Sequence, residues 1–260
     1  MSAPDATVVG AIQADARDFE DVRVGTVSAV ELPAAPGAAG PQLLSSLAQV
    51  APVADARMVD VQWQPAGRAG TTGVRAEAVV TRWKPVRKRG RGRVHQDVRL
   101  LSAEGQLVEH AVVAWDVPAG TEVRDDEAAS RVAWDVGTVA WGRHLAAGLA
   151  DNERFASAVQ TFDGSVAIRA GEEQVELRIY RGSVIEVARK SLDGPTFTVT
   201  GSERAWIDLL SSPKNDFVNR TQRNEFRSSG NNYQYLRIFK AIMLMVDEAQ
   251  LAAAKEKPSA

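Results

Sequence analysis

Three side chains that can carry acid–base chemistry alternate along one segment of the chain. His95, Asp97 and Arg99 are two residues apart, so an extended strand would place them on one face, where an imidazole and a carboxylate could meet. No serine nucleophile accompanies them, and a surface charge pattern is the simpler interpretation. His110 alternates with valines and is expected to be packed. The three histidines are scattered without acidic neighbours at ligand spacing, so no metal site is predicted.

A dense basic segment, WKPVRKRGRGR, interrupts an otherwise neutral chain. Its charged side chains could bind the phosphates of coenzyme A, or an acidic partner protein, through charge-assisted hydrogen bonds. The candidates for phosphate binding are Arg87, Lys88, Arg89 and Arg91. A solvated turn is the alternative interpretation. Nucleic-acid binding is not expected, because the segment lacks interleaved aromatic residues and the chain lacks positive charge overall.

Composition limits the classes of protein that fit. The 260 residues are 45% apolar, which is enough for two ordinary domains with buried cores. With 31 basic and 33 acidic residues the formal charge is -2, so any charge effect must be local. The absence of cysteine excludes disulfides and thiolate sites. We predict no signal peptide, no membrane span and a cytoplasmic location, because no basic region precedes an apolar stretch and no apolar run is long enough.

The first half is predicted to be a short helix followed by strands. Segments between residues 53 and 138 are rich in Val and Trp and are separated by turn residues, which is typical of an antiparallel meander. Before them, residues 43–50 carry Leu, Ala and Val at nearly helical spacing after Gly40-Pro41-Gln42. We predict an α+β protein with a boundary near Thr138, giving domains at 1–138 and 139–260.

The second half is predicted to begin and end with helices. A helix over 141–160 precedes strands with clear alternation, and a further strand runs into a helix that Ser202 would cap. The polar connector 211–232 is predicted to be a loop or a lid. In the last helix only Arg237 and Lys240 are polar between Leu236 and Val246, so most of its faces must be covered or must line a cavity.

In segment order and length, residues 141–252 resemble the sterol carrier protein domain. The segments that carry the resemblance are DGSVAIRAG, VELRIYRGSVIEV, FTVTGSERAWIDLL and the apolar terminal helix. The resemblance implies an α/β sandwich with an apolar cavity that holds fatty acyl chains, acyl-CoA or sterols without covalent chemistry or a cofactor. The candidate ligand-binding residues are Trp206, Leu210, Phe217, Tyr233, Leu236, Phe239 and Met243. Each of these is also consistent with plain core packing.

The first half resembles the hotdog fold, a helix wrapped by an antiparallel sheet, of the MaoC-like hydratase and acyl-CoA thioesterase types. The segments are DFEDVRVGT, GPQLLSSLAQV and GRVHQDVRLLSAEGQLVEHAVVAW. The resemblance implies acyl thioester substrates and a homodimer or hetero-partner joined through this domain. The catalytic pattern departs from the family, because Val27–Val50 contains no His or Asp and Gln42–Val50 contains no carboxylate. Gln42, at the helix start, and His95 remain as catalytic candidates.

Three functions follow as hypotheses. The first is binding of an acyl or steroid ligand, as a CoA thioester, by the second domain, which is joined to a degenerate, non-catalytic hotdog domain. The second is an active hotdog thioesterase or hydratase, whose acid or base would come from Asp60, Glu77, His95 or a partner subunit. The third is a protein–protein interaction subunit of an acyl-CoA enzyme complex, with the basic segment as its contact.

Overall fold

A computed structural model describes residues 22–32, 47–65, 74–86, 91–118, 131–191 and 193–256. The chain forms two compact units, residues 1–124 and 125–260. Residues 131–138, which the sequence analysis assigned to the first domain, belong to the second unit. Their 3-10 helix, η2 (Val132–Trp134), contacts the last residue of helix α8 (Phe239–Glu256), because the Ala133 N–H donates to a carboxylate oxygen of Glu256 at 3.0 Å.

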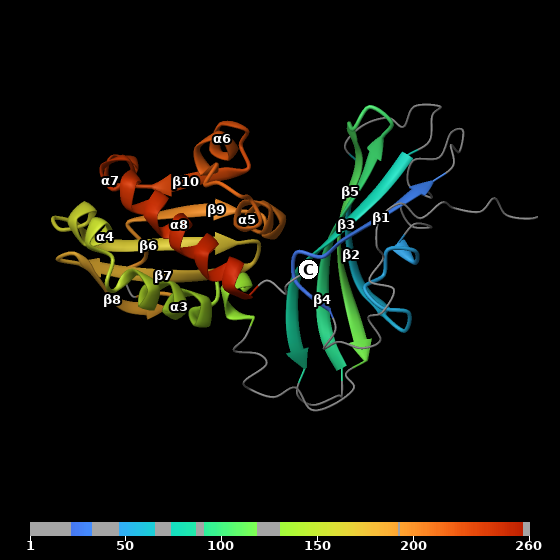
Figure 1. The fold of residues 1–260 in the computed structure, drawn as a ribbon, viewed down its shortest axis with the longest axis horizontal. Helices are drawn as coiled ribbons and strands as arrows, with labels where there is room; N and C mark the ends of the chain where they lie inside the picture. Colours follow the sequence, from blue (N-terminus) through green and yellow to red (C-terminus); the bar gives the residue numbers. More distant parts are fainter. Residues whose placement is uncertain are drawn as a thin grey trace, which may run out of the picture. The chain divides into compact units, whose positions relative to one another are not determined.

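The first unit contains a five-stranded sheet in which each neighbouring pair is antiparallel (Figure 1). The strand order is β1-β3-β4-β5-β2. The strands are β1 (Val27–Leu32), β2 (Arg57–Pro65), β3 (Val74–Val86), β4 (Arg91–Ser102) and β5 (Leu107–Pro118). The predicted antiparallel meander is confirmed for β3, β4 and β5, whereas β2 pairs with β5 rather than with β3, the next strand in sequence. Among the described strands, β1 and β2 are therefore the two edges of the sheet.

Alternation along the strands gives this sheet one apolar and one charged face. Val94, Val98 and Val113 are fully buried on the same face, as expected for period-two residues in paired strands. Gln96 on that face donates to the Val50 carbonyl at 3.1 Å, so residues around Val50 lie against it. Of the helix predicted over 43–50, the described part begins at Leu47, which is helical and buried.

The second unit is built on a mixed sheet of order β10-β9-β6-β7-β8, in which only the β6–β9 pair is parallel. Its strands are β6 (Asp163–Ala170), β7 (Glu173–Tyr180), β8 (Ser183–Ala188), β9 (Phe197–Gly201) and β10 (Phe226–Gly230). Its helices are α3 (Val139–Leu149), α4 (Glu153–Ala158), α5 (Glu203–Leu210), α6 (Phe217–Gln222), α7 (Asn232–Arg237) and α8 (Phe239–Glu256). The α+β class predicted from the sequence is confirmed.

Helix α3 lies on β7 and β8, and α8 packs on α3, α4 and α5 (Figure 1). The close approach of α3 to the sheet requires Gly142, because a Cβ there would come within 2.7 Å of a Val175 methyl and 2.8 Å of a Val187 methyl. Ser202 caps α5 as predicted, accepting from the Ala205 N–H at 3.1 Å.

Three predicted elements differ from the structure. The last helix, predicted to be continuous through Leu236 and Val246, breaks at Ile238 into α7 and α8. The single helix predicted over 141–160 is two helices, because the Asn152 side chain accepts from the Phe155 N–H at 3.0 Å and starts α4 as a separate helix. The connector 211–232 is not simply a loop, since it contains α6 and β10. Strand β10 pairs with β9 through Phe226–Gly230, whose alternation is too short to be recognised among polar residues.

An aromatic cluster fills the core of the second unit. Neighbouring rings have centroids 4.8 to 6.5 Å apart, mostly in tilted or edge-to-face contacts. In order of contact, its members are Trp141, Trp206, Phe226, Phe217, Phe239, Tyr235, Phe197 and Phe162. The cluster connects the sheet with α3, α5, α6, α7 and α8, so the positions of these helices depend on one another.

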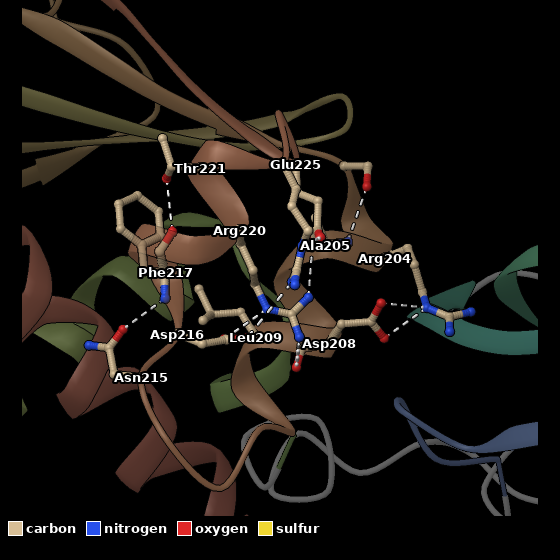
Figure 2. Close-up of polar contacts among 12 residues, drawn as sticks. Arg204, Ala205, Asp208, Leu209, Asn215, Asp216, Phe217, Arg220, Thr221 and Glu225 are labelled. Carbon is tan, nitrogen blue, oxygen red and sulfur yellow. Dashed lines mark hydrogen bonds and ion pairs between the residues drawn. The ribbon is translucent and has the colours of Figure 1, made fainter.

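Arg220 lies at the centre of a network of polar contacts between α5 and α6 (Figure 2). Its guanidinium donates to Asp216 and to Glu225, both at 2.8 Å, and to the Asp208 carbonyl at 3.2 Å. Asp208 is itself held by Arg204 at 2.8 Å. The network links the end of α5 to both ends of α6, so the segment between the two helices is fixed at each end.

The carboxyl group of Glu256 makes the stability of the second unit depend on pH. Burial raises its pKa from 4.5 to about 7, although the hydrogen bond from Ala133 opposes this change. The folded unit therefore binds a proton that the unfolded chain releases between these pH values, and the free energy of unfolding falls as pH rises through this window. Glu256→Gln keeps an acceptor for Ala133 but cannot ionise.

Between about pH 5 and about pH 8, we expect wild-type protein to lose about 2 kcal/mol more stability than Glu256→Gln. Hydrogen exchange of the α8 amides, corrected for intrinsic rates, measures this difference in the unit concerned. Parallel pH dependence in the two proteins would contradict the assignment.

Candidate functional site

An open groove of about 500 Å³ lies in the second unit between the segment that follows α5 and the C-terminal half of α8. Apolar side chains from three parts of the chain line it, namely Trp134 beside η2, Leu210 at the end of α5 and Leu251 on α8. Its volume falls within the range of about 300 to 1,000 Å³ that is usual for small-molecule sites.

Two amide side chains of the second unit hold the walls of the groove in place. The Gln250 amide nitrogen on α8 lies 2.7 Å from the Leu209 carbonyl, and 3.2 and 3.3 Å from the carbonyls of Ser212 and Lys214. The first of these carbonyls, in the last turn of α5, also accepts from the Ser212 N–H at 3.2 Å, so Gln250 adds a contact to a carbonyl that already has a backbone partner. Gln250 therefore ties α8 to the end of α5 and to the segment that follows it, and fixes the wall of the groove.

Asn215 provides the second attachment. Its amide donates to the Met243 carbonyl at 2.9 Å and to the Asp247 carboxylate at 2.7 Å. Asp247 accepts this bond but keeps its charge, so the exposed Asp247 and the exposed Lys214 place opposite charges on the lining of the groove. Apolar side chains beside a cation suit a molecule that has an apolar body and an anionic end held near Lys214.

The predicted ligand-binding residues lie in three different places. Trp206, Phe217 and Phe239 belong to the aromatic cluster, and Leu210 lines the groove. Met243 is half-buried, and its carbonyl is held by Asn215 at the groove wall.

Tyr233 and Leu236 are on the surface, with 73% and 69% of their areas exposed. The buried tyrosine of α7 is Tyr235, which contacts Phe197 at a centroid distance of 5.5 Å. Tyr233 is two residues away, about 200° around the helix, and therefore points elsewhere. The periodicity of the apolar residues did not decide which tyrosine faces the sheet.

Sequence reasoning missed most of the groove. Trp134 fell within the predicted first domain, and Gln250 and Asn215 were not singled out. A tryptophan within a polar, acidic stretch was the available signal, because such a side chain is seldom left without packing. Nothing in the local sequence indicated that Gln250 would reach the end of α5.

In the first unit, several predicted residues cannot be assigned a place. Gln42, Arg87, Lys88 and Arg89 lie outside the described residues. Arg91 is half-buried on β4, where its guanidinium donates to the Asp116 carbonyl at 2.9 Å. Phosphate binding by this group stays a prediction.

The charged face of the first sheet contains a paired carboxylate and imidazole. His110 Nε2 on β5 lies 2.6 Å from Asp97 Oδ2 on β4, and Arg99 Nε donates to Asp97 Oδ1 at 3.1 Å. Asp97 is almost fully buried and His110 is half-buried. With its proton on Nε2, His110 would donate to Asp97 and keep Nδ1 as an acceptor, which is the arrangement of a general base. The sequence analysis predicted that His110 is packed and did not pair it with Asp97.

A second carboxyl group lies on the apolar face of the same sheet. Glu109 is fully buried, with one oxygen accepting from Trp63 Nε1 at 3.2 Å and the other without a hydrogen-bond partner. Burial raises its pKa, and the Trp63 hydrogen bond opposes that rise. The sequence analysis missed Glu109, although alternation with Ala111 and Val113 could have placed it on the buried face.

Within the described ranges, no three His, Cys, Asp or Glu side chains come close enough to hold a metal ion. In the same ranges, no helix is long and apolar enough to cross a membrane.

Comparison with solved structures gives neighbours of two kinds. No family model and no curated protein matches. A crystal structure of sterol carrier protein 2 is 17% identical, with 45% of this chain and 98% of that chain covered and a TM-score of 0.38. An R-hydratase of Pseudomonas aeruginosa is 12% identical, with 42% and 92% covered and a TM-score of 0.34. A MaoC-like dehydratase of Rhodospirillum rubrum is 12% identical, with 41% and 99% covered and a TM-score of 0.36. These are neighbours of the two kinds that the sequence segments resemble.

Proposed function

We propose that the second unit binds an amphipathic molecule with an acyl or steroid body and an anionic end, such as a fatty acid or an acyl-CoA thioester. The observation that carries this proposal is the groove, with its apolar lining of Trp134, Leu210 and Leu251 and the exposed Lys214 at its rim. The sterol-carrier-like pattern of residues 141–252 supports the same class of ligand.

The groove is open, and Trp134 and Leu210 in its lining are only 8% and 4% exposed. An acyl chain that lies in it would be only partly removed from water, and burial equivalent to about four methylene groups gives about 3 kcal/mol. A dissociation constant of about 1 mM corresponds to about 4 kcal/mol, so an anionic end near Lys214 has a substantial share to supply. Part of the gain is lost to the ordering of the ligand, so we expect weak affinity.

Leu251 offers the sharpest test of the groove, because it is 56% exposed and its replacement should leave the core intact. We expect Leu251→Ser to weaken binding of dodecanoyl-CoA and of dodecanoate about tenfold. Ile185→Ser is the matched control, since Ile185 is 59% exposed on β8 outside the groove. Titration followed by tryptophan fluorescence measures the affinity, and Trp134→Phe should remove most of the signal. Equal affinity in both serine variants, or equal binding of coenzyme A without an acyl chain, would refute the groove as the site.

We also propose that the first unit associates through the edge strand β2. Eight of its nine residues are exposed, and no strand among the described residues pairs with its outer edge, which could therefore pair with a strand of a second copy. Val59 on β2 is 45% exposed, and Val27 on the opposite edge strand β1 is 49% exposed. We expect Val59→Lys to convert a dimer into a monomer in analytical ultracentrifugation, whereas Val27→Lys should not. A monomeric wild-type protein, or equal effects of the two variants, would count against β2 as the interface.

A second candidate function, hydrolysis or hydration of an acyl thioester, is favoured by one observation, the Asp97–His110 pair. In such a reaction His110 would take a proton from the attacking water, while Asp97 stabilises the charged imidazole. If the first unit is catalytic, His110→Gln should lower kcat for acyl-CoA turnover about a hundredfold or more. His144→Gln, which changes an exposed histidine on α3 in the second unit, is the control and should retain turnover. Absence of turnover in the wild-type protein would exclude this candidate.

A further inference from the structure

Four exposed side chains lie on α7 and at the start of α8, two helices that follow one another directly (Figure 1). Tyr233, Leu236 and Arg237 are spaced i, i+3 and i+4 and share one face of α7, and Lys240 is exposed in the first turn of α8, after the break at Ile238. Tyr233 and Leu236 are the most exposed large apolar side chains in the part of the chain that the structure describes. We call these four residues the α7 stripe.

The α7 stripe has no evident role in folding. The packing of this region is carried by the opposite face, where Tyr235, Ile238 and Ile242 are buried. Tyr235 contacts Phe197 and Phe239 in the aromatic cluster. Two large apolar side chains one turn apart, left open to water beside two cations, therefore require a contact outside the unit to account for them.

The charge around the stripe is strongly positive for a chain with a formal charge of -2. Residues 211–240 contain six basic and two acidic residues, a local charge of about +4. The two acids, Asp216 and Glu225, are held by Arg220, and Arg223 contacts Glu225 as well. Within the described residues no carboxylate pairs with Arg227, Arg237 or Lys240.

Arg237 is also fixed in place. Its guanidinium donates to the carbonyl and the hydroxyl oxygen of Thr161, the latter at 2.6 Å. These neutral acceptors orient the side chain without cancelling its charge. The positive charge next to Leu236 is therefore a built feature of the surface.

We propose that the α7 stripe docks the protein on an anionic lipid bilayer. Tyrosine and leucine side chains enter the boundary between headgroups and acyl chains, and flanking Lys and Arg bind anionic headgroups. This proposal rests on the proposed function, because a protein that binds a ligand with an acyl body would take that ligand from a membrane or return it there. An acidic protein surface would attract the two cations equally well, but it would not account for the exposed pair of apolar side chains. A bilayer accounts for both, because the apolar pair can enter its interior.

Vesicle co-sedimentation of the full chain tests the proposal. We expect binding to vesicles of phosphatidylcholine with phosphatidylglycerol, and little binding to vesicles of phosphatidylcholine alone. The double variant Tyr233→Ser, Leu236→Ser should bind the anionic vesicles at least about tenfold more weakly. Ile185→Ser, which removes an equally exposed apolar side chain from β8, is the control and should bind like wild type.

The charge contribution is tested with Lys240→Glu and with salt. Both the variant and about 1 M NaCl, where the screening length is about 3 Å, should reduce binding to anionic vesicles. Absence of vesicle binding by the wild-type protein, or binding that the double variant retains, would overturn the proposal, and the stripe would then be assigned to a protein partner.

Titration of the double variant with soluble dodecanoate, without vesicles, separates this proposal from the proposed function. Retained ligand binding with lost vesicle binding supports the stripe. Loss of ligand binding in the variant would place the apolar pair in the ligand site and would overturn a separate docking role.

Discussion

The groove depends on one set of hydrogen bonds, those from the Gln250 amide to the carbonyls at the end of α5 and in the segment that follows. One amide group on α8 thereby reaches both the last turn of α5, where the Leu209 carbonyl also accepts from the Ser212 N–H, and the segment that follows that helix. Because α8 is itself fixed by the aromatic cluster and by Asn215, the segment 211–215 cannot move without breaking several contacts. The groove is therefore expected to be largely preformed, which reduces the cost of ordering on binding.

The exposed face of α8 connects the two sites proposed for the second unit. Lys240, Met243, Asp247 and Leu251 follow one another at spacings of three and four residues, from the α7 stripe to the groove. At a rise of about 1.5 Å per residue, the path from Lys240 to Leu251 is about 16 Å long. This is close to the length of a fatty acyl chain, so a ligand leaving a bilayer at the stripe would have to move little more than its own length to reach the groove.

The sequence predicted the elements whose signals are local. Alternation predicted most strands of both sheets, although not β10, and Ser202 predicted the start of α5, because each signal depends only on near neighbours. Contacts between distant segments were not predictable in this way. The side chain of Gln250 reaches α5 from 41 residues away, and Asp97 meets His110 only because β4 and β5 pair in one register. Tyr235, rather than Tyr233, faces the sheet because α7 is oriented by Phe197, which lies on a separate strand.

The most direct measurement is of nuclear Overhauser effects between an acyl ligand and the protein by NMR. If the groove holds the ligand, the methylene protons of bound dodecanoate will show contacts with the Trp134 indole and the Leu251 methyl groups. Contacts with Phe162, Phe197 and Tyr235 instead would mean that the ligand enters the aromatic core and that the groove is not the site.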